Sequence, residues 1–191
     1  GVKLLIIIYS LLILGLFQFP SVAQTIFGYL FLNLAYTFYL KHQPIIDIFT
    51  ISSGFILRVY AGALAVSVPV SSWMFVTVLC LALYLASVKR RQELTFNSKL
   101  GRNVHKYYTP ALLNRYAEIS AISSLMFYSL YVMSEHPDLV ITIPCVIYGI
   151  FRYWYLVELS DAGESPTETL LADGQLLITI IIWVALCAHF I

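Results

Sequence analysis

Charged residues are scarce in this sequence. Only 11% of its 191 residues are Asp, Glu, Lys or Arg, whereas 60% are hydrophobic. Soluble domains carry about a quarter charged residues, because their surfaces face water. The composition therefore excludes an ordinary soluble domain and indicates an integral membrane protein. No basic patch typical of a nucleic-acid-binding protein is present either.

Clustered metal ligands and familiar catalytic arrangements are also lacking. Cys80, Cys145 and Cys187 lie far apart within apolar runs, and none belongs to a CxxC pair. We interpret them as small membrane-buried residues, in preference to metal ligands or disulfide partners. The four histidines share no ligand spacing, and we find no Ser/His/Asp arrangement and no glycine-rich phosphate loop. The sequence thus predicts no metal site built from its own residues.

Long apolar segments are what the sequence does have. Seven of them, at 4–17, 22–40, 45–66, 73–88, 112–133, 139–157 and 176–190, are interpreted as helices that cross the roughly 30 Å hydrocarbon core. They predict an all-α, polytopic transmembrane helix bundle in which residues 1–191 form a single domain. Pro166, Thr167 and Glu168 followed by Leu170 and Leu171 predict a short amphipathic helix with proline at its first position.

Cations are absent from three of the predicted connections. The turns at 18–21, 67–72 and 134–138 contain no Lys or Arg. By the positive-inside rule these turns lie outside the cell, so the N-terminus lies inside and the polar stretches at 89–110 and 158–175 face the cytoplasm. The cations on the predicted cytoplasmic side are Lys3, Lys41, Lys89, Arg90, Arg91, Lys99, Arg102, Lys106, Arg115 and Arg152.

The run from Lys89 to Glu93 follows an apolar segment directly. Three consecutive cations at headgroup depth act either as topology anchors or as ligands of a phosphate. Glu93 lies four residues after Lys89, so one helical turn presents a cation and a carboxylate to the cytoplasmic side. Tyr84 lies on an adjoining face. The next stretch repeats the theme with Arg102, His105, Lys106, Tyr107 and Tyr108.

Arg58 is the eleventh cation, and it lies deep within the apolar segment 45–66. At this depth a cation is costly, so its side chain should face the bundle interior or a watery cavity. Asp47 lies eleven residues earlier on the same helix face, about 16 Å away, too far for the two to pair. Each therefore needs a partner from another segment. For Arg58 this is either a polar group of a neighbouring helix or a ligand phosphate.

Two further features lie on the predicted cytoplasmic side. Arg152 precedes Tyr153, Trp154 and Tyr155, a pattern typical of a snorkelling cation in an aromatic belt. Glu168 belongs to an acidic stretch, where it could bind a metal, organise the cations or simply be solvated.

Several strings together resemble the decaprenyl-phosphate phosphoribosyltransferase family, a branch of the UbiA prenyltransferase superfamily. The resemblance covers essentially the whole chain. Its strings are Leu32–Tyr36 with Leu40-Lys41, Asp47 with Gly54–Arg58 and Ala61–Ala63, Lys89–Leu94, Pro144 with Tyr148–Tyr153, and Pro166–Glu168 with Leu170, Leu171 and Asp173.

The resemblance implies a UbiA-like, nine-helix membrane fold, of which this chain has about seven helices, the C-terminal ones. It also implies transfer of 5-phosphoribose from phosphoribosyl diphosphate to a polyprenyl phosphate, with Mg²⁺ and release of diphosphate, in cell-envelope glycolipid biosynthesis. The family's first Asp-rich motif is missing, so we expect the Mg²⁺ ligands in an N-terminal part not present here, and the chain alone to be inactive. Superfamily members with a second Asp-rich motif carry it where this chain has Lys89-Arg90-Arg91, which favours direct contact with phosphate.

The resulting hypothesis assigns roles to individual residues. Lys89, Arg90 and Arg58 contact phosphate, Glu93 and Asp47 orient them, and Tyr84 contacts the ribose or a phosphate. Further substrate-binding candidates are Lys41, Arg91, Arg152 and Glu168. The expected location is the inner membrane with the active side cytoplasmic, and a homo-oligomer or a complementing N-terminal segment is a further expected partner. Two alternatives stay open: a UbiA-type enzyme that uses a prenyl diphosphate, and a non-catalytic membrane bundle.

Overall fold

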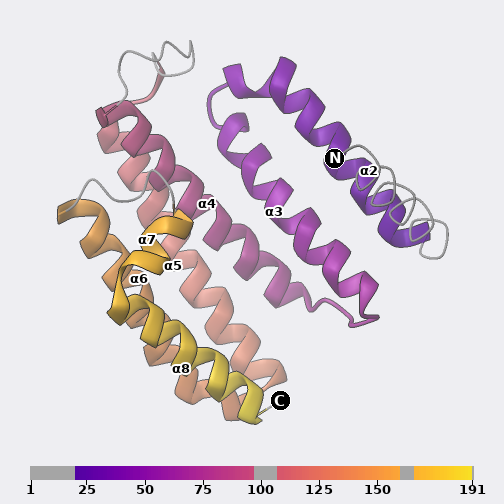
Figure 1. Ribbon diagram of the computed structural model, residues 1–191, viewed down its shortest axis with the longest axis vertical. Coiled ribbons are helices and arrows are strands. Elements are labelled where there is room, and N and C mark those ends of the chain that lie inside the picture. Colours follow the sequence, from indigo (N-terminus) through magenta and orange to yellow (C-terminus); the bar gives the residue numbers. More distant parts are fainter. Residues whose placement is uncertain (1–19, 97–106, 160–165, 191) are drawn as a thin grey trace, which may run out of the picture.

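The computed structural model describes residues 20–96, 107–159 and 166–190, and in these ranges the regular structure is entirely helical (Figure 1). The prediction of an all-α bundle is confirmed. The predicted span at 4–17 lies outside the described residues. The elements are α2 (Pro20–Phe38), η1 (Leu40–His42), α3 (Ile46–Ala65), α4 (Ser72–Phe96), α5 (Pro110–Glu135), η3 (Pro137–Thr142), α6 (Ile143–Leu159), α7 (Pro166–Ala172) and α8 (Gly174–Phe190).

The helix boundaries follow local sequence signals. Thr109 caps α5 by accepting a hydrogen bond from the Leu112 amide at 3.2 Å, and Pro110 takes the first helical position, where no amide hydrogen is needed. The predicted short helix with proline at its head is α7. The largest departure is at α4, which was predicted to leave the membrane at Val88 and in fact continues as helix through Phe96. The polar residues from Lys89 to Glu93 are therefore held on a rigid helix.

The helices pack as neighbours in a chain of contacts. Helix α4 contacts α3 on one side and α5 on another, α2 contacts α3, and α6 contacts α8 (Figure 1). Helix α2 lies at the edge, where Gly54 of α3 lets Tyr29 approach to within 3.6 Å of the place a Cβ would occupy. None of the side chains of α2 is buried.

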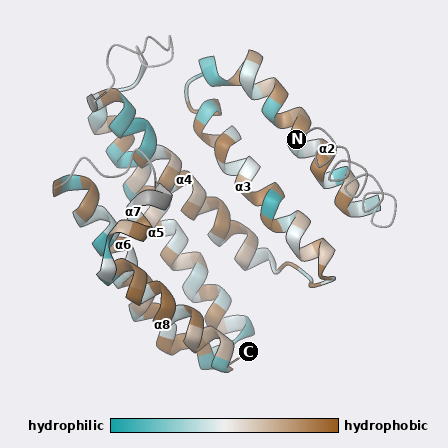
Figure 2. Ribbon diagram, in the orientation of Figure 1, coloured by the Kyte–Doolittle hydropathy of each residue, from teal (hydrophilic) through white to brown (hydrophobic). Residues whose placement is uncertain are grey.

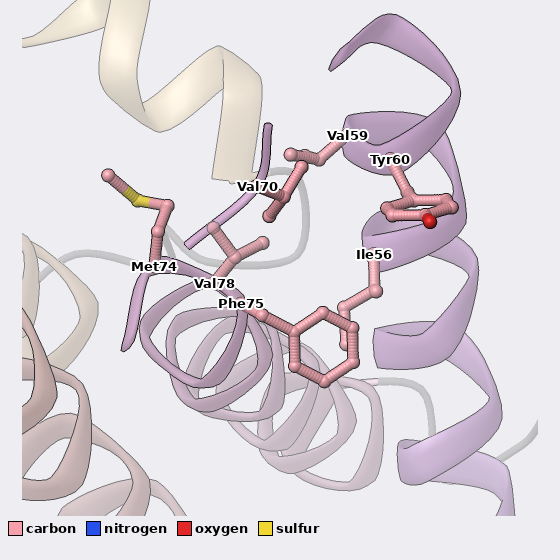
Figure 3. A pocket seen from close by; sticks show the side chains of 7 residues that line it. All are labelled: Ile56, Val59, Tyr60, Val70, Met74, Phe75 and Val78. Atoms are coloured by element: carbon pink, nitrogen blue, oxygen red, sulfur yellow. The ribbon is translucent and has the colours of Figure 1, made fainter. Parts of the chain in front are cut away.

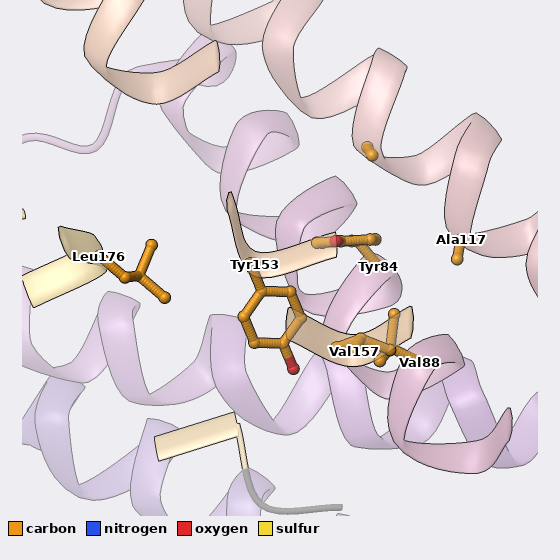
Figure 4. Close-up of a cluster of buried hydrophobic side chains, with 7 residues drawn as sticks. Tyr84, Val88, Ala117, Tyr153, Val157 and Leu176 are labelled. Carbon is orange, nitrogen blue, oxygen red and sulfur yellow. The ribbon is translucent and has the colours of Figure 1, made fainter. Parts of the chain in front are cut away.

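An apolar core joins α4, α5, α6 and α8. Tyr84 and Val88 of α4 pack with Tyr153 and Val157 of α6 and with Leu176 of α8 (Figure 4). The rings of Tyr84 and Tyr153 meet edge to face, with centroids 5.8 Å apart. Aromatic contacts of this kind stabilise beyond the area that they bury. This core sets the rotation of α4, and with it the direction of the cations that follow.

Three of the described helical segments are long and apolar enough to cross a membrane: Ile46–Ala65, Ser72–Thr95 and Pro137–Leu159. Gly174–Phe190 is apolar but shorter. Figure 2 shows this apolar character along α8, and hydrophilic residues at the upper end of α4. The membrane character predicted from composition is confirmed, whereas fewer helices meet these length and hydropathy criteria than the seven spans that were expected.

Two of the connections that were predicted to be cytoplasmic lie at the same end of the bundle (Figure 1). The α2–α3 connection and the paired ends of α4 and α5 lie towards the top of Figure 1, and the α3–α4 connection lies lower. Near that lower connection is a pocket of about 10 Å³ between α3 and α4, lined by Ile56, Val59, Tyr60, Val70, Met74, Phe75 and Val78 (Figure 3). It has room for about one water molecule and contains no charged side chain, so it is no substrate site.

Candidate functional site

Arg90 is the centre of a buried ionic cluster at the upper end of α4. Only 2% of its side chain is exposed. Its Nη2 lies 2.9 Å from Oδ2 of Asp47 on α3, and its Nη1 pairs with Glu93 one turn further along α4. The hydroxyl of Tyr36 accepts a longer hydrogen bond, 3.4 Å, from Nη2. The cluster therefore joins α2, α3 and α4 through one guanidinium.

Helix geometry explains the pairing within α4. Because the helix continues past Val88, Arg90 and Glu93 are three residues apart on one face and can meet. The sequence had instead suggested that Lys89 and Glu93 face the cytoplasm together. In the structure Glu93 pairs with Arg90 instead, and Lys89 is exposed.

Tyr108 completes the cluster from the segment before α5. Its hydroxyl donates to Oδ1 of Asp47 at 2.6 Å and accepts from the Ile45 amide at 2.5 Å. Burial, followed by the hydrogen bond to Asp47, raises the pKa of Tyr108 above its usual value, so the phenol stays protonated and remains a donor. Both oxygens of Asp47 are thus engaged, one by a phenol and one by a guanidinium.

Lys89 follows a stretch of α4 that lines a large apolar cavity. Leu85 and Leu81, about one and two turns before Lys89, line a cavity of about 360 Å³ that is bounded by α4, α5, α6, α7 and α8. Tyr84 and Tyr153 line it as well, and their buried hydroxyls have no hydrogen-bond partner among the described residues. Lys89 itself is exposed and lies about one helical turn beyond Leu85, the nearest of these lining residues of α4. Tyr84 faces this space, packed against Trp154 at 5.6 Å, and makes no described contact with Lys89.

Arg91 links α4 to α5 and α6. Its Nη1 donates to Oδ1 of Asn114 on α5 at 2.6 Å and pairs with Glu158 at the end of α6. The neighbouring Gln92 donates to the Val157 carbonyl at 3.0 Å. These contacts favour the structural interpretation of this cation over direct contact with a phosphate.

Arg152 forms an ion pair that was not predicted. Its Nε and Nη2 donate to the two oxygens of Asp173 at 3.1 and 2.7 Å, and its guanidinium lies over the ring of Tyr155 at 5.1 Å. Asp173 also accepts from the Leu176 amide at 2.8 Å, which caps α8. The bond from Arg152, followed by that from Leu176, lowers the pKa of Asp173. The pair joins α6 to the start of α8.

Arg58 lies apart from the cluster, at the α2–α3 contact. It is exposed, donates to the Tyr29 hydroxyl, and lies 4.9 and 5.2 Å from the ring centres of Tyr29 and Phe55. None of the carboxylates that the structure describes pairs with it. The prediction that Asp47 and Arg58 find separate partners on other segments is confirmed, since Asp47 pairs with Arg90.

Comparison with known proteins gives the chain its relatives. No family model matches it. It is 33% identical over 174 residues to the decaprenyl-phosphate phosphoribosyltransferase of Corynebacterium glutamicum, a match that covers 86% of this chain and 52% of that protein. The enzyme of the same name from Mycolicibacterium smegmatis is 33% identical over 173 residues, 82% of this chain and 54% of that protein. That from Mycobacterium tuberculosis H37Rv is 30% identical over 174 residues, covering 87% and 57%.

The chain is a relative of the decaprenyl-phosphate phosphoribosyltransferases. The resemblance drawn from its sequence strings is confirmed. The chain spans about half the length of the curated relatives that it matches. The residue roles stay predictions, because a similarity over the chain assigns no function to single side chains.

The described residues do not fit the Mg²⁺ ion that the resemblance implies. Mg²⁺ requires several oxygen ligands in near-octahedral order. No group of three or more His, Cys, Asp or Glu in the described part of the chain could hold a metal ion. Asp47 is already engaged by Tyr108 and Arg90, and Glu93 also pairs with Arg90. The magnesium requirement stays a prediction.

The remaining candidates divide between described and undescribed residues. Lys41 lies half-buried in η1, at the end of the bundle that carries the cluster. The side chain of Glu168 lies outside the described residues, as do Arg102, His105 and Lys106. The sequence noted Tyr108 only as one aromatic residue in a basic stretch. Its pairing with Asp47 spans 61 residues, a separation that no local spacing signal reveals.

Proposed function

We propose that this chain belongs to a membrane transferase that moves 5-phosphoribose from phosphoribosyl diphosphate to a polyprenyl phosphate such as decaprenyl phosphate. The observation that carries the proposal is an exposed cation, Lys89, on the helix that lines a large apolar cavity, one turn beyond the lining residue Leu85 and next to Arg90 of the buried ionic cluster. A phosphate group with a long hydrocarbon chain matches these two surroundings at once. The names of the relatives support the same substrate class.

Lys89 is the cation best placed to bind a phosphate of either substrate. Its ammonium is exposed and can direct its three donors to phosphate oxygens. Arg90, which was predicted to contact phosphate, has a positioning role in this proposal. Asp47 and Glu93 occupy its Nη atoms and its side chain is buried, so it positions the end of α4 and sets the local charge.

The apolar cavity suits the hydrocarbon chain of the acceptor. It is lined almost wholly by carbon atoms from α4, α5, α6 and α8. The buried hydroxyls of Tyr84 and Tyr153 have no hydrogen-bond partner among the described residues, and a phenol without a partner can donate to a phosphate oxygen. The cavity also keeps bulk water from the reacting carbon, which discourages hydrolysis.

The proposed reaction needs no strong general base. The bond between the anomeric carbon of the ribose and a diphosphate oxygen breaks, and a bond from that carbon to an oxygen of the lipid phosphate forms. Diphosphate leaves with the electron pair, while positive charge develops on the sugar. The acceptor phosphate is already anionic at neutral pH, so no proton has to be removed. Fixed cations such as Lys89 stabilise the charge of the leaving group.

The proposed location is the inner membrane, with the cluster on the cytoplasmic side. The connections at that end of the bundle carry the Lys and Arg residues, and the turns at the opposite end have none. A water-soluble phosphorylated donor would then reach Lys89 directly from the cytoplasm.

The test compares Lys89→Met with Arg115→Met, a change to an exposed cation on α5. Membranes from cells that express the complete gene receive labelled phosphoribosyl diphosphate and decaprenyl phosphate. We expect wild type and Arg115→Met to form labelled lipid, and Lys89→Met to lose about 10- to 100-fold of the rate, the usual effect of one charge-assisted hydrogen bond. Transfer from a prenyl diphosphate instead would establish the alternative enzyme. Failure of the wild type to bind or use either donor would favour a non-catalytic bundle.

A further inference from the structure

We propose that Tyr108 is a positioning residue for the anion site, acting through Asp47 and the strained peptide of Ile45. The inference deepens the proposed function, because it assumes that the upper end of α4 binds phosphate groups. Tyr108 does not touch the exposed ammonium of Lys89 in any described contact. Its effect passes through Asp47 to Arg90, and from Arg90 to the neighbouring Lys89.

The backbone at Ile45 needs an external partner. This residue has φ 68° and ψ −48°, the positive-φ conformation of a γ-turn closed by the bond from the Ile46 amide to the Pro44 carbonyl at 2.8 Å, which is costly for a β-branched side chain. It stands directly before α3, where the first amides of a helix have no partner within the helix, and no side chain of the N-cap residue supplies one. The Tyr108 hydroxyl accepts the Ile45 amide at 2.5 Å and so holds the chain in this bend.

The same hydroxyl also fixes Asp47. It donates to Oδ1 at 2.6 Å, while Oδ2 lies 2.9 Å from Arg90. Asp47 has no exposed surface, and a buried carboxylate is tolerated only when its oxygens have partners. Tyr108 therefore completes the anion that holds Arg90, and one oxygen atom controls both the start of α3 and the direction of that carboxylate.

The connection reaches Lys89 through the rigid helix. Arg90 is joined to α3 by Asp47, so the rotation of α4 about its axis relative to α3 depends on this pair. Lys89 is the preceding residue of the same helix, and it points outwards because Arg90 points inwards. Loss of the Tyr108 hydroxyl would free Asp47 to rotate, and would loosen the position of the cation that meets the phosphate.

The chain supplies a matched control in the adjacent tyrosine. Tyr107 is 67% exposed, whereas Tyr108 is 6% exposed. Tyr108→Phe keeps the packed ring and removes only the hydroxyl, and Tyr107→Phe makes the same chemical change next to it. Any difference between the two variants therefore reports the buried hydrogen bonds.

The experiment measures donor and acceptor kinetics of the protein expressed from its complete gene, together with the binding of inorganic diphosphate. We expect Tyr108→Phe to raise the apparent KM for phosphoribosyl diphosphate and the Kd for diphosphate about tenfold, the effect of one lost hydrogen bond. The acceptor KM and the Tyr107→Phe variant should stay within twofold of the wild-type values. In an Asp47→Asn background, the further change Tyr108→Phe should alter donor KM by less than twofold, because the path through the carboxylate is already lost.

A role in folding alone would lower the amount of folded protein and leave the donor KM of the surviving fraction unchanged, which would overturn the inference. If Tyr108→Phe fails to fold, hydrogen exchange of the wild-type protein tests the inference instead. Diphosphate should then slow hydrogen exchange in the peptide that contains Ile45, and an unchanged exchange rate would overturn the inference. If the wild type binds diphosphate and Tyr108→Phe binds it equally well, only the positioning role is refuted. Wild-type protein that binds no diphosphate refutes the proposed function as well.

Discussion

Two arginines of this protein lie in opposite surroundings. Arg90 is almost fully buried between α2, α3 and α4, and two carboxylates and a phenol surround its guanidinium. Arg58 is exposed on α3, beside the phenol of Tyr29 and the ring of Phe55, without a carboxylate partner among the described residues. Both were candidates for phosphate contact by residue type and membrane depth. The comparison shows that depth along a helix does not tell a structural cation from one that is free to bind a ligand.

The energies behind the two sites differ in kind. A buried charge keeps its neighbours charged, so removing it leaves Asp47 and Glu93 uncompensated. An exposed guanidinium held by rings and one hydroxyl contributes little to folding. Arg58 thus has donors left for a ligand, whereas in Arg90 only Nε has no partner among the described groups.

The largest expected effect is on folding, in Arg90→Met. Met retains much of the apolar stem but leaves the buried Asp47 and the partly buried Glu93 without their cation. We expect a loss of about 3–5 kcal/mol of stability, as found when one member of a buried ion pair is removed. Thermal unfolding in detergent measures it, with Lys89→Met as the control, because that cation is exposed. A normal melting profile for Arg90→Met would show that the cluster does not hold α3 to α4.

Arg58→Met should separate function from stability. The stability change should be at most about 1 kcal/mol, the size of an exposed cation–π contact. If Arg58 contacts a substrate phosphate, transfer should be abolished while the protein still inserts and accumulates. Tyr29→Phe is the control, since it removes the hydrogen bond and keeps the charge. Poor accumulation of Arg58→Met, with normal turnover by its folded fraction, would instead make Arg58 structural and erase the contrast with Arg90.

The smallest effect concerns the partly exposed pair of Arg152 and Asp173, which is intermediate between the two arginine sites. The pKa of Asp173 is lowered in the folded protein. Its stabilising contribution is therefore complete above the ordinary carboxyl pKa of about 4, and is lost as the pH falls through the lower folded value. The difference in melting temperature between wild type and Asp173→Asn should shrink over that acidic range. Asn still caps a helix, so Asp173→Ala should melt lower than Asp173→Asn. A difference that does not vary with pH would mean that the ion pair contributes nothing.

Much of the fold could be predicted because its signals are local. Apolar run lengths located α2, α3, α5, α6 and α8 within a few residues, and Pro166 marked the start of α7, where a missing amide hydrogen costs nothing. The end of α4 was wrong for an equally local reason. Hydropathy detects where a helix leaves the membrane, at Val88, but not that the helix continues through Phe96.

The candidate site could be predicted only in part. The hypothesis drawn from the family resemblance placed Arg90, Asp47 and Glu93 in one site, and the structure brings these three together. It did not show that Arg90 is buried and held by both carboxylates, because burial depends on the packing of α3 against α4. The pair of Arg152 and Asp173 was missed for the same reason, since its members lie on different segments.

The sequence by itself determined that this is a helical membrane protein, because hydrophobicity acts on each segment separately. Tertiary structure alone decided which cation is buried and which is exposed. Tyr108 meets Asp47 across 61 residues, and Arg90 meets Tyr36 across 54. Contacts between residues so far apart in the sequence depend on how helices rotate and pack against one another. Packing is a property of the whole bundle that no single segment encodes.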